Sequence, residues 1–154
     1  MTRLSAAILA TLCLAVPASA QVLPGFAGNW EGDGTLTRAG EPAQTFRCRL
    51  RIVPLELREA QFVGRCVTAQ GSQSVNYTLT ESPDGALVAT DRRPLPDTRP
   101  AELTGTASIG QLRFSDESGA GVTLIRAGET LRFEIAGEDE AGRVRGAAVL
   151  QLRD

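Results

Sequence analysis

The sequence predicts an all-β protein folded as one antiparallel up-and-down barrel of about eight to ten strands. Apolar and polar residues alternate along most of the chain after residue 30, glycine- and proline-containing turns separate the alternating runs, and no amphipathic helix is evident. Alternation with period two places one face of each strand in a core and the other in water. Closure removes unpaired sheet edges and buries the apolar face. A two-sheet β-sandwich is the alternative.

The first 20 residues are typical of a cleavable leader. Arg3 supplies a positive charge, residues 6–15 are almost entirely apolar, and Ala18-Ser19-Ala20 forms a small-residue cleavage site before Gln21. The apolar run is shorter than the about 20 residues that span a bilayer, so a retained membrane anchor is the less favoured interpretation. We expect a signal peptide at residues 1–20, a single domain at residues 21–154, and a periplasmic or secreted location.

Charge and composition exclude several kinds of partner. The net charge is −2, the 16 basic residues are all arginine, and there is no histidine. A mildly acidic domain lacks the basic surface that neutralises phosphates, so we expect no nucleic-acid partner. No later apolar run is long enough to span a membrane. We expect a monomer whose partner is an unidentified small ligand or protein.

The clearest strand signal lies at residues 46–52. Four apolar residues there alternate with three arginines: Phe46, Cys48, Leu50 and Ile52 against Arg47, Arg49 and Arg51. Residues 30–37 also alternate, and a hairpin centred near Gly40–Glu41 would bring Glu31 and Asp33 opposite the arginines. Opposite charges across strands stabilise a sheet by roughly 0.2–1 kcal/mol per pair. We interpret this face as neutralised and solvent-exposed; an anion-binding strip is the alternative.

Cys48 and Cys66 are the two cysteines that remain after the leader. A turn near residues 55–58 would place Cys48 opposite Cys66 on paired strands, which is close enough for a disulfide. An even number of cysteines in an exported chain also predicts one structural disulfide. A redox pair or a metal site is less favoured, since there is no CxxC spacing and no histidine.

Further alternating runs complete the predicted meander. We expect strands at residues 61–68, 74–80, 87–90, 103–108, 112–115, 122–125, 131–135 and 144–152. Residues 93–100 contain three prolines, which a central strand does not tolerate, so they form the longest expected surface loop.

Gly28-Asn29-Trp30 opens the first strand, and this segment resembles the GxW start of calycin-type barrels, the lipocalin and avidin-like proteins. Together with Cys48-Arg49-Leu50 and Gly64-Arg65-Cys66, it is similar to small exported proteins of proteobacteria, a likeness that brings no known activity. A weaker likeness exists to periplasmic metalloprotease inhibitors, although their second tryptophan is absent here. The resemblance implies that Trp30 closes one barrel end beneath an arginine, Arg145 or Arg153.

The missing histidine removes most catalytic machinery. It excludes Ser-His-Asp and Cys-His arrangements and HExxH zinc sites, and we expect no catalytic residue, metal or cofactor. Gly32-Asp33-Gly34 is followed by a strand rather than a helix, so it is not a dinucleotide loop; these glycines let the strand bend sharply. A carboxylate-based hydrolase using Glu31 and Asp33 is a distant alternative.

The barrel interior is the remaining candidate site. Its apolar face includes Phe46 and Tyr77, and a hydroxyl on an aromatic ring can orient a ligand; Trp30 is the third candidate binding residue. We expect a non-enzymatic binding module for a small apolar or amphipathic ligand, with a filled core as the alternative interior. The alternative function is a protein-interaction module, such as a periplasmic protease inhibitor, acting through residues 21–26 or 93–100.

Overall fold

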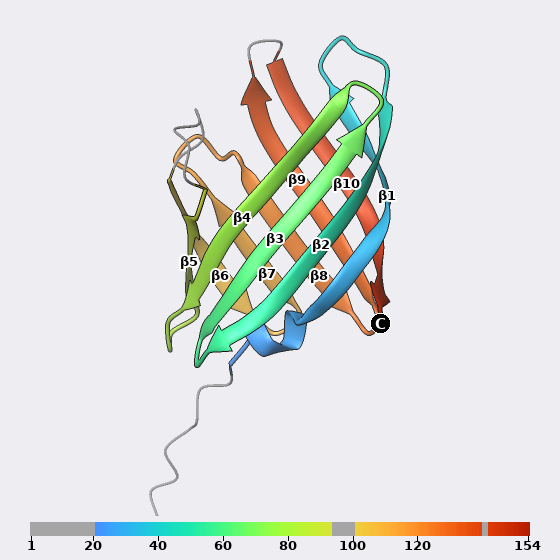
Figure 1. Ribbon diagram of the computed structural model, residues 1–154. Coiled ribbons are helices and arrows are strands. Elements are labelled where there is room, and N and C mark those ends of the chain that lie inside the picture. The colour runs from blue at the N-terminus through green and yellow to red at the C-terminus, as the bar shows by residue number, and fades with distance from the viewer. Residues whose placement is uncertain (1–20, 94–100, 140–141) are drawn as a thin grey trace, which may run out of the picture.

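The computed structural model describes residues 21–93, 101–139 and 142–154, and they form a closed antiparallel barrel of ten strands (Figure 1). A short 3₁₀ helix, η1 (Leu23–Phe26), precedes the barrel. The strands are β1 (Gly28–Arg38), β2 (Gln44–Glu56), β3 (Glu59–Thr68), β4 (Gly71–Glu81), β5 (Ala86–Asp91), β6 (Glu102–Ser108), β7 (Gln111–Ser115), β8 (Gly121–Ala127), β9 (Thr130–Asp139) and β10 (Gly142–Arg153). Each strand pairs with its neighbours in sequence, and β10 pairs with β1, which confirms the predicted up-and-down barrel.

The two ends of the barrel differ. Helix η1 and the β2–β3, β4–β5, β6–β7 and β8–β9 turns lie at one end, which we call the closed end; the opposite end is the open end (Figure 1). Strands β5 to β8 have five to seven residues, whereas the other six have 10 to 13. The longer strands therefore form a taller wall toward the open end.

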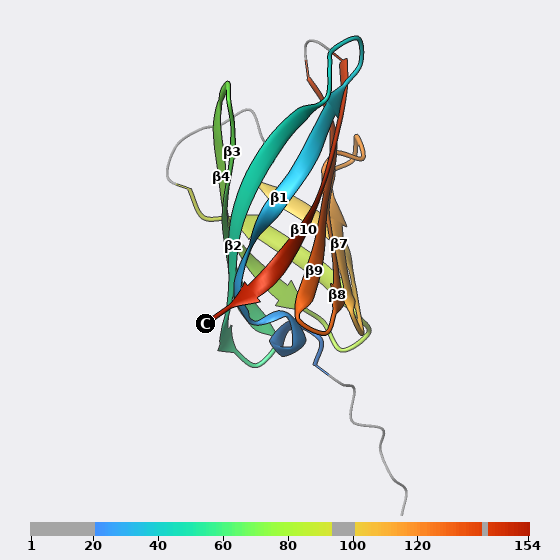
Figure 2. The ribbon, with the colours of Figure 1, turned by 90° about the vertical axis from the view of Figure 1, so that its right-hand side faces the viewer.

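Glycines allow the barrel to turn two tight corners. A Cβ atom on Gly32 would lie 2.2 Å from the carbonyl oxygen of Val149 on β10, and one on Gly105 of β6 would lie 1.8 Å from that of Arg113 on β7. The two corners lie on opposite sides of the strand order. Figures 1 and 2, viewed at right angles, show a broader and a narrower side of the barrel. Gly32 thus leaves room for the close approach of β10, which is consistent with the sharp bend predicted for this strand.

The predicted register of the first three strands is also confirmed. Glu31 lies opposite Arg49 and Asp33 opposite Arg47. Cys48 lies opposite Cys66, the two form a disulfide, and their Cα atoms are 4.1 Å apart. This bond ties β2 to β3 on the inner face of the barrel.

Two sequence predictions fall outside the described residues: the leader at residues 1–20 and most of the proline-rich loop at residues 93–100. Within the described ranges, no helix combines the length and hydrophobicity needed to cross a membrane.

Candidate binding site at the open end of the barrel

The closed end is sealed by the N-terminal segment. Helix η1 has a proline, Pro24, in its first turn, and its Leu23 and Phe26 side chains are fully buried against the core. Trp30, the third residue of β1, donates a hydrogen bond from Nε1 to the Phe26 carbonyl oxygen at 3.0 Å. Trp30 is only 1% exposed. Its ring therefore closes this end, as the resemblance to calycin-type barrels implies.

The arginine over Trp30 is Arg126 of β8, not Arg145 or Arg153. Its guanidinium carbon lies 5.3 Å from the centre of the Trp30 ring, and Nη1 donates to the Gly25 carbonyl oxygen. Arg145 and Arg153 are exposed on the outer face of β10. The prediction was wrong because the inward-facing residue near the closed end of β10 is Leu152, and both arginines of that strand face outward. On β8 the inward-facing residue near the closed end is Arg126. We call the segment from Val22 to Phe26, together with the Trp30 ring, the plug. The arginine over the ring stabilises the plug by cation–π attraction.

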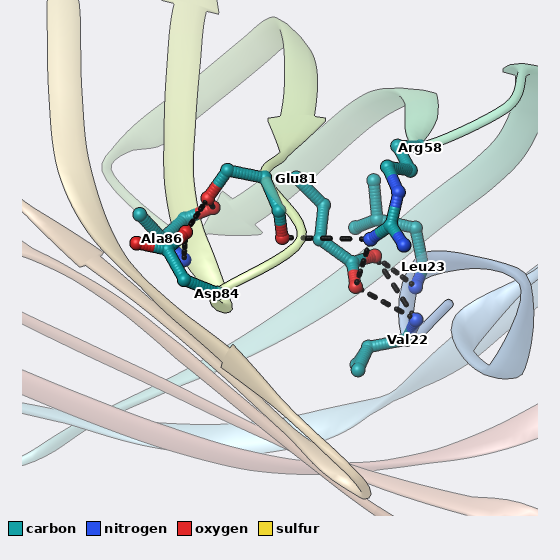
Figure 3. Close-up of polar contacts among 7 residues, drawn as sticks. Val22, Leu23, Arg58, Glu81, Asp84 and Ala86 are labelled. Carbon is teal, nitrogen blue, oxygen red and sulfur yellow. Dashed lines mark hydrogen bonds and ion pairs between the residues drawn. The ribbon is translucent and has the colours of Figure 1, made fainter. Parts of the chain in front are cut away.

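Glu81 fastens the plug to the barrel wall (Figure 3). Among the described residues it is the one charged residue that is buried, and its side chain is 2% exposed. Its two carboxylate oxygens accept hydrogen bonds from the backbone nitrogens of Val22, at 3.1 and 3.0 Å, and Leu23, at 3.1 Å. Arg58 Nη1 lies 3.6 Å from Oε1. A buried carboxylate needs such donors, so they hold the N-terminal segment in place.

Apolar side chains line the inner wall toward the open end. Phe46 is 4% exposed, and four half-buried residues from four other strands pack against the core around it: Leu36, Val75, Val122 and Ile135. Leu36 and Ile135 meet over Gly146, where an added Cβ would lie 3.1 and 2.8 Å from their side-chain carbons. These side chains cap the filled core on the side away from the plug and are partly reachable from solvent.

Tyr77 lies deeper than Val75, two residues further along β4 from the open end. It is 4% exposed and packs at 6.3 Å between ring centroids from Phe114, which lies 6.0 Å from Phe62. Tyr77 therefore belongs to an aromatic layer below the open end. Its phenol adds a polar group to an interior that is otherwise largely apolar.

Polar residues follow the edge of the open end. The side-chain amide of Gln44 donates to Oε1 of Gln70 at 3.3 Å. At the open end of β5, Asp91 accepts hydrogen bonds from the backbone nitrogen and the guanidinium of Arg93. The Arg93 hydrogen bond holds the pKa of the Asp91 carboxyl below its usual range. The open end thus has an apolar inner wall and a charged edge.

The three predicted binding residues do not form one site. Trp30 is sealed into the closed end, Tyr77 lies in the middle of the core, and Phe46 lies nearest the open end. Sequence reasoning missed Glu81 and Arg126. Glu81 has the same parity as Val75, Tyr77 and Leu79, so the alternation that predicted the strand also carried the signal of a buried carboxylate.

In the part of the chain that the structure describes, no three Cys, Asp or Glu side chains lie together in a way that could hold a metal ion. Compared with models of known protein families and with curated protein sequences, the chain shows no match.

Proposed function

We propose that this protein is an exported, non-enzymatic binding module that takes a small apolar or amphipathic ligand at the open end of the barrel. The observation that carries the proposal is the contrast between the two ends. The closed end is plugged and fastened by Glu81, whereas half-buried apolar side chains line the open end. A ligand would cover Leu36, Val75 and Ile135 and place its polar group at the edge near Gln44 or Asp91.

The disulfide and the predicted leader support the part of the proposal that concerns export. Disulfides persist in oxidising compartments and are rare in the cytosol, and Cys48 and Cys66 are bonded. The leader at residues 1–20 would route the chain to the periplasm or the medium. Intact-mass measurement of protein from the exporting cell would test this. We expect the mass of a chain that starts at Gln21, reduced by two hydrogens because the two thiols form a disulfide.

The resemblance to calycin-type barrels also supports a ligand at the open end. A ten-strand up-and-down barrel with a tryptophan at one end is the architecture that the resemblance implies. In such barrels one end is closed and a ligand enters at the other.

A protein-interaction module, such as a protease inhibitor, is the alternative. Residues 21–26 are one of its two candidate contact segments, and Leu23 and Phe26 are both buried in the plug. The other segment, residues 93–100, lies mostly outside the described residues. An interaction through this segment would first have to break the Glu81 hydrogen bonds and expose those two side chains. An interaction through residues 21–26 therefore requires a partner that binds this segment more tightly than the barrel does.

Titration with N-phenyl-1-naphthylamine, a neutral fluorescent probe, tests the open end. We expect saturable binding to the wild type and about tenfold weaker binding to Ile135→Gln, because an apolar contact worth roughly 1.5 kcal/mol is lost. Ile125→Gln is the matched control, since Ile125 faces outward on β8. It should bind the probe as the wild type does.

Two results would contradict the proposal. One is the absence of saturable probe binding together with ligand-free protein in native mass spectrometry of material from the exporting cell. The other is an equal loss of probe affinity in Ile135→Gln and Ile125→Gln, which would mean that the probe does not bind at the open end. Thermal unfolding of each variant confirms that the compared proteins are folded.

A further inference from the structure

The outer wall over β1, β2 and β3 carries more positive charge than the sequence pattern alone indicates. The predicted ion pairs are present: Arg47 Nε lies 2.8 Å from Asp33 Oδ1, and Arg49 Nε lies 3.2 Å from Glu31 Oε1. Strand β3 adds Arg65 to the same face. The wall therefore has one more cation than the hairpin of β1 and β2 supplies.

Arg49 and Arg65 lie directly opposite each other across β2 and β3. Like charges in this position destabilise a sheet. Arg65 donates to the uncharged hydroxyl of Ser72 at 3.1 Å, and among the described residues no carboxylate lies within ion-pair distance of Arg65 or Arg51. The two acids of β1 thus leave part of this positive charge unbalanced.

A hollow of about 790 Å³ lies over these arginines. Its lining comes from neighbouring strands and combines guanidinium, hydroxyl and apolar groups: Arg47, Arg49, Arg65, Asp33, Thr45, Thr68, Phe46, Val67 and Ala69. The Arg47–Asp33 pair closes one side by two hydrogen bonds of 2.8 and 3.0 Å. Arg65, which has no carboxylate partner among the described residues, lies opposite Arg49, whose Nε is paired with Glu31. Both guanidinium groups line the hollow beside its hydroxyl groups.

We propose that this hollow is a binding site for a phosphate or sulfate group, with Arg49 and Arg65 bound to its oxygens. Guanidinium groups match the geometry of such oxyanions and form charge-assisted hydrogen bonds with them. A bound dianion would attract both guanidinium groups and so offset the repulsion between the two arginines. The arginines face the outer wall, whereas the ligand proposed above would contact the inner wall, so this proposal does not depend on that function.

Titration with inorganic phosphate, followed by NMR of the arginine Nε–H groups, tests the site. We expect saturable binding with shifts at Arg49 and Arg65. The double variant R49Q/R65Q should bind at least about tenfold more weakly, since two charge-assisted hydrogen bonds are removed. R113Q/R145Q is the matched control, because it removes two outer-wall arginines from a different face with the same change in charge.

Vesicles of phosphatidylcholine with and without phosphatidic acid distinguish the source of the group. Binding of free phosphate that depends on Arg49 and Arg65 supports a soluble ligand. Binding only to vesicles with phosphatidic acid, if it is also lost in R49Q/R65Q, supports a site that binds the phosphate of a lipid headgroup. No binding in either arm, or equal loss in both double variants, overturns the proposal. Both double variants should unfold at temperatures close to the wild type, since all four side chains are exposed.

Discussion

At the scale of single residues, Glu81 has the most demanding environment in the described part of the chain. Its carboxylate is removed from water and accepts three hydrogen bonds from two consecutive backbone nitrogens. Those nitrogens belong to the segment that closes the barrel. The cost of burying the charge is offset only while the plug stays docked, so Glu81 couples the order of the N-terminal segment to the stability of the wall.

Replacing Glu81 should therefore loosen the plug. We expect Glu81→Gln to lower the free energy of unfolding by about 1–3 kcal/mol. The amide keeps only one of the two acceptor oxygens, turns an NH2 donor toward the backbone N–H groups, and loses the charge that faces Arg58. Glu56→Gln, an exposed acid at the same end, is the control and should change it by less than about 0.5 kcal/mol. Urea unfolding measures both, and equal values would show that the buried carboxylate does not hold the plug.

Asp33 gives a pH-dependent prediction. The side-chain hydrogen bond from Arg47 holds the pKa of this carboxyl below its usual range. A lowered folded-state pKa adds stability above the unfolded value, near pH 3.9, that disappears as the pH falls through the folded-state value. Asp33→Asn should thus be slightly less stable than the wild type at pH 7, and the difference should be smaller at about pH 3, below the unfolded value.

The effect of Asp33→Asn should be small because both partners are more than half exposed and solvent screens exposed pairs. It should shrink further in 1 M salt. Urea unfolding at the two pH values measures it. A difference that persisted in strong acid would mean that Asp33 acts through something other than its charge.

At the scale of elements, two devices fix the barrel: the disulfide between β2 and β3 and the glycines at the corners. Reduction of the Cys48–Cys66 bond should cost about 3 kcal/mol, the value expected for a loop of this length. Unfolding in urea with and without a reducing agent measures the difference. A reduced protein as stable as the oxidised one would show that the strand ladders alone set the register.

The corner at β6–β7 should not tolerate a side chain. Gly105→Ala would place a methyl group 1.8 Å from the Arg113 carbonyl oxygen, so the strands must separate, at a cost of about 3 kcal/mol or more. Gly71→Ala is the control, since nothing lies within 4 Å of its added Cβ. Thermal unfolding compares the two. Equal stabilities would mean that the corner relaxes freely.

The sequence predicted most strands because alternation is a local property. Residues 46–52 alternate without interruption, and β2 contains them with the predicted face inward. The hairpin register followed from charge, since Glu31 and Asp33 share parity with the arginines and now lie opposite them. Alternation also predicted short strands at residues 87–90, 103–108, 112–115 and 122–125, where β5 to β8 lie. It did not predict that β9 would extend to Asp139, because strand length depends on how far neighbouring strands extend.

The plug and the arginine above Trp30 could not be predicted in the same way. Residues 22–26 are too few to show a period, and their burial depends on a carboxylate 58 or 59 positions away. Arg126 looked like an ordinary polar residue at the end of a strand. It meets Trp30 only because the barrel closes and brings β8 to the closed end.

At the scale of the whole molecule, the N-terminal segment closes one end of the barrel, and the opposite end is the one that we propose for ligand binding. Aromatic and aliphatic side chains fill the middle, and the N-terminal segment covers the closed end. The tall wall of longer strands presents its apolar inner face at the open end. A filled middle restricts a ligand to the space above Phe46, so the expected ligand is shallowly bound rather than enclosed.

Methyl NMR during titration with N-phenyl-1-naphthylamine tests this division most directly, because leucine, valine and isoleucine side chains lie at both ends. We expect saturable shifts at Leu36, Val75 and Ile135, with Leu23 and Leu152 at the closed end unchanged. Shifts concentrated at Leu23 and Leu152, or none that saturate, would contradict it.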